Sequence, residues 1–180
     1  MRKNIQLHEL SFEPYIKPKA IRKRVKEIGQ SLSENFYDKR PVFLAILNGS
    51  FVFAADLSRA CTFDHEISFI KLTSYEGTSS TGKVITHIGL QENLEGRDVI
   101  LVEDIIDTGN TIYNFLPTLK KSKPKSITIV SLLLKPDALE RPLEVQYIGF
   151  KIPTKFVVGY GLDYNGLGRN LKGIYQLKSG

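Results

Sequence analysis

Residues 99–111 read VILVEDIIDTGNT, an apolar run that leads into three carboxylates and then into a small polar turn. Glu103 and Asp104 stand together at the end of the run, and Asp107 directly precedes the turn. Backbone N–H groups and hydroxyls at the start of a helix bind phosphate without a lysine. Carboxylates accept hydrogen bonds from sugar hydroxyls, attract Mg²⁺ and take up protons. A ribose 5-phosphate with a metal ion would use all of these groups, whereas a strand end with solvated acids and a capped helix is the simpler alternative.

Strand and helix patterns alternate along the 180 residues, a length sufficient for one domain with a substantial core. Short, continuously apolar runs joined through helical patterns are typical of a parallel sheet covered by helices on both faces. We therefore expect an α/β fold without an internal repeat or a dividing linker. Pro117 falls inside the last helical pattern and is expected to kink or shorten that helix. The predicted helices cover about 18–36, 51–60 and a segment around 112–119; the predicted strands are 42–47, 66–72, 84–90, 98–104, 126–134, 147–150 and 156–160.

Ligands of a parallel sheet bind beyond the carboxyl ends of its strands. Three loops occupy that position, at 47–50, 73–83 and 103–111. The middle loop contains GTSSTGKV, which has the spacing of a nucleotide-binding P-loop. However, Val84 stands where that motif needs Ser or Thr, and a strand pattern follows. A long polar loop of this kind is more typical of a mobile lid over a ligand.

Other residues that could do chemistry lack a supporting pattern. The tripeptide at 107–109 matches the catalytic Asp-Thr-Gly of aspartic proteases, but those proteins are all-β and this tripeptide leads from a strand into a helix. His8, His65 and His87 have no ligand-like spacing and are expected to be surface or packing residues. Cys61 ends a helical pattern and is expected to be buried rather than nucleophilic.

The chain is basic, with 25 Lys and Arg against 19 Asp and Glu and a formal net charge of +6. In the basic block 17–26, Ile21 and Val25 fall at helical spacing, so a solvated outer helix face is favoured over nucleic-acid binding. The single cysteine suits a reducing compartment. No apolar run has the length of a signal peptide or of a membrane span. We therefore expect a soluble, cytoplasmic protein that binds neither nucleic acid nor membrane.

Several motifs, in order over nearly the whole chain, resemble one family. The stretch VILVEDIIDTGNT resembles the phosphoribosyl pyrophosphate signature of the type I phosphoribosyltransferases, and its EDIIDTGNT form resembles their hypoxanthine-guanine branch. LNGS at 47–50 resembles the pyrophosphate loop, although Asn48 stands where relatives often have a basic residue. The remaining motifs are KLTSYEGTSSTGKV at 71–84, which resembles the flexible lid, LLLKPD at 132–137, the strand end with the base-reading lysine, and IGFKIPTKFVVGYGLDYNGLGRNL at 148–171, the purine-binding hood.

The resemblance implies a single phosphoribosyltransferase domain over residues 1–180, with a type I parallel sheet and a small hood built from the C-terminal and N-terminal segments. It implies transfer of a phosphoribosyl group from phosphoribosyl pyrophosphate to hypoxanthine or guanine, giving IMP or GMP and pyrophosphate. Mg²⁺ is the implied cofactor, and a homodimer or homotetramer is the implied assembly. A transferase that prefers xanthine and a regulator of the same fold that binds nucleic acid are the alternatives. The intact lid and hood, with no added DNA-binding domain, favour the enzyme.

The resemblance also implies a role for individual residues. Asp107 would accept the proton of the base, and the peptide bond that enters Gly49 would be cis. The other implied sets are Glu103, Asp104, Thr108, Gly109, Asn110 and Thr111 for the ribose and its phosphate; Asn48, Gly49 and Arg169 for pyrophosphate; Ser74 and Tyr75 in the lid; Lys135, Lys155, Phe156, Val157 and Asp163 for the base; and Glu103, Asp104 and Asp163 for Mg²⁺.

Overall fold

The computed structural model describes residues 3–74, 84–88 and 93–178, with only the backbone path given at 73–74 and 84–88. The helices are α1 (Pro18–Phe36), α2 (Phe51–Ala60), α3 (Asn110–Lys121) and the short 3-10 helix η1 (Pro136–Ala138). The strands are β1 (Ile5–Leu7), β2 (Leu10–Ile16), β3 (Val42–Leu47), β4 (Glu66–Ser74), β5 (Val84–Ile88), β6 (Asp98–Ile106), β7 (Ser126–Leu134), β8 (Tyr147–Lys151), β9 (Val157–Val158) and β10 (Ile174–Leu177).

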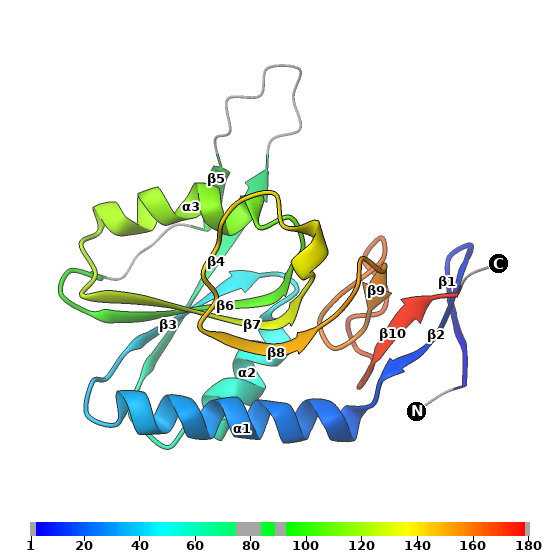
Figure 1. The fold of residues 1–180 in the computed structure, drawn as a ribbon, viewed down its shortest axis with the longest axis horizontal. Helices are drawn as coiled ribbons and strands as arrows, with labels where there is room; N and C mark the ends of the chain where they lie inside the picture. Colours follow the sequence, from blue (N-terminus) through cyan, green and yellow to red (C-terminus); the bar gives the residue numbers. More distant parts are fainter. Residues whose placement is uncertain (1–2, 75–83, 89–92, 179–180) are drawn as a thin grey trace.

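A six-stranded sheet forms the body of the structure, in the order β5-β4-β3-β6-β7-β8. Five of its strands run parallel, and β5 is antiparallel to β4 at one edge. Helices α1 and α2 lie on one face and α3 on the other (Figure 1). The predicted parallel sheet with helices on both faces is therefore confirmed.

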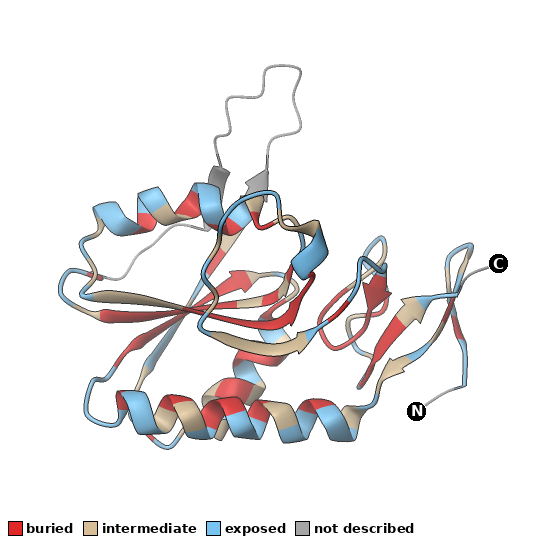
Figure 2. Ribbon diagram, in the orientation of Figure 1, coloured by how far each residue is buried: buried red, intermediate tan, exposed pale blue. Residues whose placement is uncertain are grey.

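The central strands are buried on both sides because their apolar residues alternate between two cores (Figure 2). Both faces of a parallel sheet are covered in this way only when the strands are apolar throughout. Phe43, Ala45, Ile100 and Val102 pack with α1 and α2, and Val42, Leu44, Val99 and Leu101 pack on the side of α3.

A second, four-stranded sheet, β1-β2-β10-β9, joins the two ends of the chain and forms the hood. Its pairings are antiparallel, and Phe12, Val158 and Tyr175 form a small apolar cluster of its own. The strand predicted at 156–160 exists as Val157–Val158, but it belongs to this hood rather than to the main sheet.

The expected shortening of the helix at Pro117 does not occur. Helix α3 continues through Pro117 to Lys121. A proline removes the N–H that would bond to the carbonyl of Tyr113. Because Pro117 lies on the exposed face of α3, water can bind that carbonyl instead. None of the helices in the described residues is long and apolar enough to cross a membrane.

The basic outer face predicted for α1 is present, but Arg24 does more than contact solvent. Its Nε donates to the carbonyl of Gly149 at 3.0 Å and its Nη2 to the carbonyl of Ile148 at 2.8 Å. Nη1 also donates to Glu27 at 3.0 Å. Arg24 therefore fastens α1 to β8, the edge strand of the main sheet.

We expect Arg24→Ala to destabilise the protein and Arg22→Ala, at an exposed position of the same helix, to leave it nearly unchanged. Hydrogen bonds from a charged donor contribute about 1.5–3 kcal/mol, and the partial exposure of Arg24 reduces this to about 1–2 kcal/mol. For a protein of this size the melting temperature should fall by about 2–8 °C. Equal melting temperatures of the two variants would show that the bonds to β8 contribute nothing to stability.

Candidate active site

The turn after β6 begins α3 without a side-chain cap. Gly109 adopts φ of 79°, a left-handed conformation that glycine adopts without strain. The N–H of Asn110 is directed at Oγ1 of Thr108 at 3.3 Å. The first N–H groups of a helix have no partner within the helix, so this turn offers the donors of a phosphate site at a helix N-terminus.

Two adjoining hollows lie beyond the carboxyl ends of β3 and β6. They have volumes of about 250 and 350 Å³, and Ile105 and Asp107 line both. The first is also lined by Ile46, Leu47, Leu72, Glu103, Ile106, Thr108, Gly109, Thr111 and Ile112. The second is also lined by Asn48, Gly49, Asp104, Lys135, Phe156, Val157, Leu162, Asp163 and Arg169.

Asp107 and Lys135 meet where the two hollows join. In the parallel register of β6 and β7, Ile106 is opposite Leu134, so the next residue of each strand lies beside the other. The Lys135 backbone N–H donates to the carbonyl of Ile106 at 2.9 Å, and its Nζ donates to Oδ2 of Asp107 at 2.5 Å. Only 8% of the Lys135 side chain is exposed, against 50% for Asp107. A buried ammonium is thus held by a carboxylate that faces the cleft.

The alternation of β6 side chains between the two faces of the sheet is interrupted between Val102 and Ile105, where Glu103 and Asp104 lie. Ile105 packs with the α1–α2 core and Ile106 with the α3 core, although Val102 already faced α1 and α2. Oδ1 of Asp104 accepts the N–H of Ile105 at 2.9 Å across this break. Glu103 and Asp104 are adjacent in the strand, so they point to opposite faces of the sheet and line different hollows.

The loop after β3 packs closely against Asp104. A Cβ atom on Gly49 would lie 1.7 Å from Oδ2 of Asp104, so a larger residue cannot occupy this position without displacing the carboxylate. The cis peptide bond lies between Leu47 and Asn48, one residue earlier than the bond predicted to be cis. In the hood, a Cβ on Gly161 would lie 2.0 Å from the carbonyl oxygen of Gly49.

Asp163 and Arg169 pair on the hood side of the second hollow. Arg169 Nη2 lies 2.8 Å from Oδ1 of Asp163, and Nη1 donates to the carbonyl of Gly161 at 2.8 Å. The N–H of Gly166 donates to Oδ2 of Asp163 at 2.8 Å. The guanidinium is therefore held in place beside the loop of Gly49.

Phe156 and Val157 line the second hollow, and the Phe156 ring is 44% exposed. Its centroid lies 6.0 Å from that of Phe12 and 5.7 Å from that of Tyr164. One side of the ring is thus supported by the hood while the ring remains accessible.

Burial raises the pKa of Glu103 well above its usual range, and the neighbouring Asp104 carboxylate raises this pKa further. Within the described residues, no three acidic, His or Cys side chains converge on one point as a complete metal cage. Mg²⁺ in phosphate-handling sites is held by one or two carboxylates together with phosphate oxygens and water. Asp104 and Asp163, which line the same hollow, fit that kind of site.

Some predicted site residues lie elsewhere. Nζ of Lys155 donates to Gln176 at 2.7 Å and lies 5.1 Å from the Tyr15 ring centre, and Lys155 lines neither hollow. The side chain of Asn110 also lines neither hollow, because its amide donates to Glu140 at 2.7 Å. The lid residues Ser74 and Tyr75 fall outside the side chains that the structure describes.

Among the residues that line the second hollow, two were not predicted, Ile105 and Leu162. Ile105 stands inside the EDIID motif, and its position between Asp104 and Asp107 was a usable signal. Leu162 lies in the hood turn, where the sequence offers no periodicity to assign it.

The model of the phosphoribosyl transferase domain family matches residues 15–165. The chain belongs to the phosphoribosyltransferase family. Among phosphoribosyltransferases, the hypoxanthine phosphoribosyltransferase of Escherichia coli (strain K12) is 43% identical over 147 residues, 80% of this chain and 83% of its own. The hypoxanthine-guanine phosphoribosyltransferase of Staphylococcus aureus (strain Mu50) is 42% identical over 154 residues, 85% of this chain and 86% of its own.

Solved phosphoribosyltransferases have the same fold. A crystal structure of a hypoxanthine phosphoribosyltransferase from Staphylococcus aureus superposes with a TM-score of 0.88 at 40% identity, covering 92% of this chain and 91% of that one. A hypoxanthine-guanine phosphoribosyltransferase from Bacillus anthracis, with a HEPES molecule in its active site, gives 0.88 at 38% identity over 92% and 98%. The type I fold predicted from the motifs is therefore confirmed.

His65, His8 and Cys61 make packing contacts, and the side chain of His87 lies outside those that the structure describes. His65 donates or accepts at Ser58 Oγ, 2.7 Å away, and at the carbonyl of Phe63, 2.8 Å away. His8 lies edge-on to Tyr164. Cys61 packs against the α1–α2 core, and burial raises the pKa of its thiol to about 12.

We expect the Cys61 thiol of the native protein to react with iodoacetamide at pH 8 at least about 10²-fold more slowly than in urea. The thiolate is the reactive form, and a free cysteine has a pKa of about 8.5. With the folded pKa raised to about 12, almost no thiolate exists at pH 8. The rate should rise as the pH approaches that value. Equal rates in the native and unfolded protein would contradict the burial of this side chain.

Proposed function

We propose that this protein acts in purine salvage and transfers the phosphoribosyl group of phosphoribosyl pyrophosphate to hypoxanthine or guanine, giving IMP or GMP and pyrophosphate. The observation that carries the proposal is the pair of Lys135 and Asp107. An ammonium donor and a carboxylate acceptor 2.5 Å apart match the 6-oxo acceptor and the ring N–H donor that lie side by side on one edge of a 6-oxopurine. The names of the relatives from Escherichia coli and Staphylococcus aureus support the same choice of base.

The chemistry requires positioning and charge rather than a nucleophile from the protein. A bond forms between C1 of the ribose and the ring nitrogen of the base while the bond from C1 to the pyrophosphate oxygen breaks. Such a displacement passes through an oxocarbenium-like state, which a preorganised polar site stabilises. Asp107 takes up the proton of the five-membered ring, so that the nitrogen can share its electron pair. Phe156 stacks on the purine, Val157 binds its edge through the backbone, and Asp163 lies near the base.

The first hollow suits the ribose 5-phosphate. The turn 108–111 binds the phosphate through backbone N–H groups and the hydroxyls of Thr108 and Thr111, with Gly109 and Asn110 contributing backbone donors. Glu103 and Asp104 accept hydrogen bonds from the ribose hydroxyls. Burial raises the pKa of Glu103 because little water reaches its carboxyl group. A sugar hydroxyl can take the place of that water as a hydrogen-bond donor.

The second hollow suits the base and the leaving group. Arg169 and the backbone around Asn48 and Gly49 bind the pyrophosphate, and the loop has no basic side chain at position 48. Asp104, Asp163 and Glu103 are the residues that would hold Mg²⁺, which when bound neutralises charge on the pyrophosphate. Ser74 and Tyr75 would belong to a lid that excludes water.

The hood and the main sheet form one functional unit over residues 1–180 in this proposal, because both line the second hollow. We further propose a homodimer or homotetramer. Ile67 and Phe69 on β4 are 41% and 38% exposed, and Phe51 is 44% exposed, which supplies apolar surface for a second copy. A cytoplasmic location is part of the same proposal.

We expect Asp107→Asn to keep the affinity for phosphoribosyl pyrophosphate and to lower kcat by about 10²-fold or more, the usual contribution of a general base. Steady-state assays with hypoxanthine measure this, and Asp64→Asn, at an exposed position far from the cleft, is the matched control. An unchanged kcat would leave Asp107 with a structural role only.

We expect hypoxanthine and guanine to be good substrates and adenine to be nearly inert. Adenine carries an amino donor where Lys135 also offers a donor, and a site built around one hydrogen bond can reject such an analogue by about 10⁴-fold. Lys135→Met should remove most of the efficiency with 6-oxopurines while hardly changing the affinity for phosphoribosyl pyrophosphate. A purine panel assayed with both proteins, and with Lys151→Met at the exposed end of β8 as control, measures this. Comparable use of adenine by the wild type, or full activity of Lys135→Met, would exclude Lys135 as the base-reading residue.

A further inference from the structure

The segment 135–140, between β7 and the loop that follows, runs beside the turn 106–110 and bonds to it at both ends. At one end the Lys135 N–H donates to the carbonyl of Ile106 at 2.9 Å, and Nζ donates to Asp107. At the other end the Glu140 N–H donates to the carbonyl of Thr108 at 3.0 Å. The Glu140 carboxylate accepts the side-chain amide of Asn110 at 2.7 Å.

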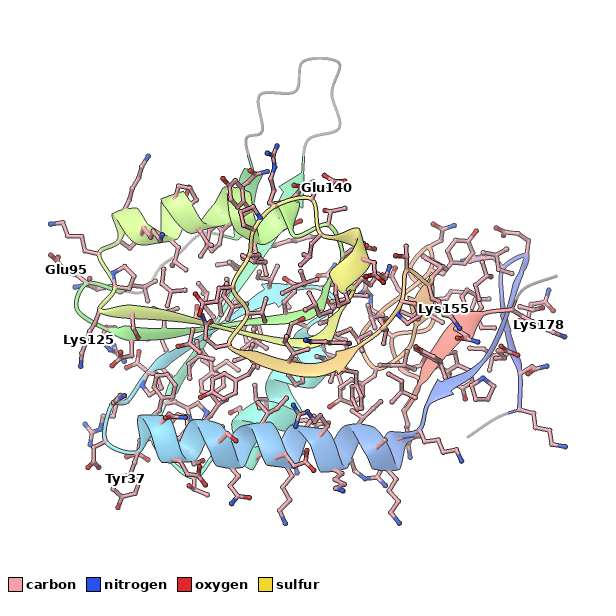
Figure 3. The ribbon with its side chains drawn as sticks, in the orientation of Figure 1. Tyr37, Glu95, Lys125, Glu140, Lys155 and Lys178 are labelled. Carbon is pink, nitrogen blue, oxygen red and sulfur yellow. The ribbon has the colours of Figure 1, made fainter. Side chains whose placement is uncertain are left out.

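Glu140 lies next to the start of α3, as Figure 3 shows. The contact continues below it, because a Cβ on Gly109 would lie 3.2 Å from Cδ2 of Leu139 and 3.6 Å from Cδ2 of Leu143. The carboxylate of Glu140 therefore lies beside the turn, and the Glu140 backbone, Leu139 and Leu143 contact the same turn.

A carboxylate is an unexpected neighbour for a turn that binds phosphate, since two negative charges repel. A helix N-terminus also favours an acid for its own stability. Glu140 therefore repels the phosphate and stabilises the start of α3 at the same time. Its hydrogen bond to Asn110 decides which of these two effects is larger. That bond holds the Asn110 side chain away from the hollow, so the side chain does not compete with the ligand for the turn.

The turn needs such support because it is flexible by composition. Gly109 has more conformational freedom than any other residue type and loses more of it on ordering. The helix that follows has no side-chain cap. Holding the turn in its binding conformation before the ligand arrives reduces the ordering cost that binding must meet.

We propose that Glu140 is a positioning residue for the 5′-phosphate: through Asn110 it holds the turn 108–111 in the conformation that binds the phosphate of phosphoribosyl pyrophosphate. This inference rests on the proposed function. Glu140 acts through Asn110 and does not touch the substrate. Its contribution belongs to the phosphate end of the cleft and leaves the base end and the pyrophosphate end unaffected.

The test compares Glu140→Ala, which removes the hydrogen bond and the charge, with Glu140→Gln, which keeps an acceptor for Asn110 and removes only the charge. Glu144→Ala, at an exposed acid of the same loop, is the matched control. For each protein we would measure kcat, KM for phosphoribosyl pyrophosphate and for hypoxanthine, the dissociation constants of ribose 5-phosphate and of pyrophosphate by calorimetry, and the melting temperature.

We expect Glu140→Ala to weaken ribose 5-phosphate binding and to raise KM for phosphoribosyl pyrophosphate, each by about 2–10-fold, the range of one hydrogen bond. Pyrophosphate binding, KM for hypoxanthine and kcat should stay within about twofold. Glu140→Gln should bind ribose 5-phosphate at least as well as the wild type, and Glu144→Ala should equal it. Asn110→Ala should match Glu140→Ala, and the double variant should be no worse than either, because both remove the same bond.

Three results would overturn the proposal. Tighter ribose 5-phosphate binding by both Glu140 variants would show that charge repulsion outweighs positioning. Unchanged binding in Glu140→Ala would give the residue no role at the phosphate end, and an equal loss for pyrophosphate would indicate general damage to the site. Absence of turnover in the wild type would refute the proposed function instead, and the ribose 5-phosphate titrations would still report on Glu140.

Discussion

The cleft depends on two close contacts of the Gly49 loop, one with the carboxylate of Asp104 and one with the backbone of the hood, which only glycine permits. Gly49 follows β3 and leaves no room for a Cβ beside the carboxylate of Asp104 at the end of β6. Gly161 of the hood lies equally close to the carbonyl of Gly49. Beside this contact Tyr160 donates its hydroxyl to Asp56 of α2 at 2.6 Å, and that bond and burial raise the tyrosine pKa. The hood is therefore attached to the sheet at the site itself, and the loop of Gly49 is packed between the hood and the carboxylate of Asp104.

The charged residues at the two ends of the cleft are held by different partners. At the junction, a buried ammonium needs a partner to remain charged, and Asp107 supplies it while keeping half of its side chain accessible. At the hood, Arg169 is fixed by Asp163 and by a backbone carbonyl, so its guanidinium is oriented before any ligand arrives. A charged side chain that neighbouring residues already hold in place needs little rearrangement when a charged ligand binds.

Much of this arrangement could be predicted from local patterns, and the rest depends on pairing across the sheet. Apolar runs located β3, β6 and β7, and the turn composition located the start of α3 that we propose as the phosphate site, because those signals are contained in a few adjacent residues. The contact of Asp107 with Lys135 joins positions 28 apart and follows from the register of Ile106 with Leu134, which periodicity does not reveal. Solvent and tertiary neighbours also determine three features that the local sequence does not reveal: the position of the cis bond, the continuation of α3 through Pro117 and the orientation of Lys155. The motifs of the family supplied the proposed roles of residues such as Phe156 and Val157, which patterns alone do not distinguish from ordinary core.

Arg24 also bears on how the protein behaves in a crowded solution. β8 is the last strand of the main sheet, and an open strand edge with unpaired carbonyls can recruit a strand from another molecule. The guanidinium of Arg24 covers the carbonyls of Ile148 and Gly149 and places a positive charge over that edge. Because these two backbone carbonyls are paired within the molecule, fewer acceptors remain on β8 for a strand of another molecule.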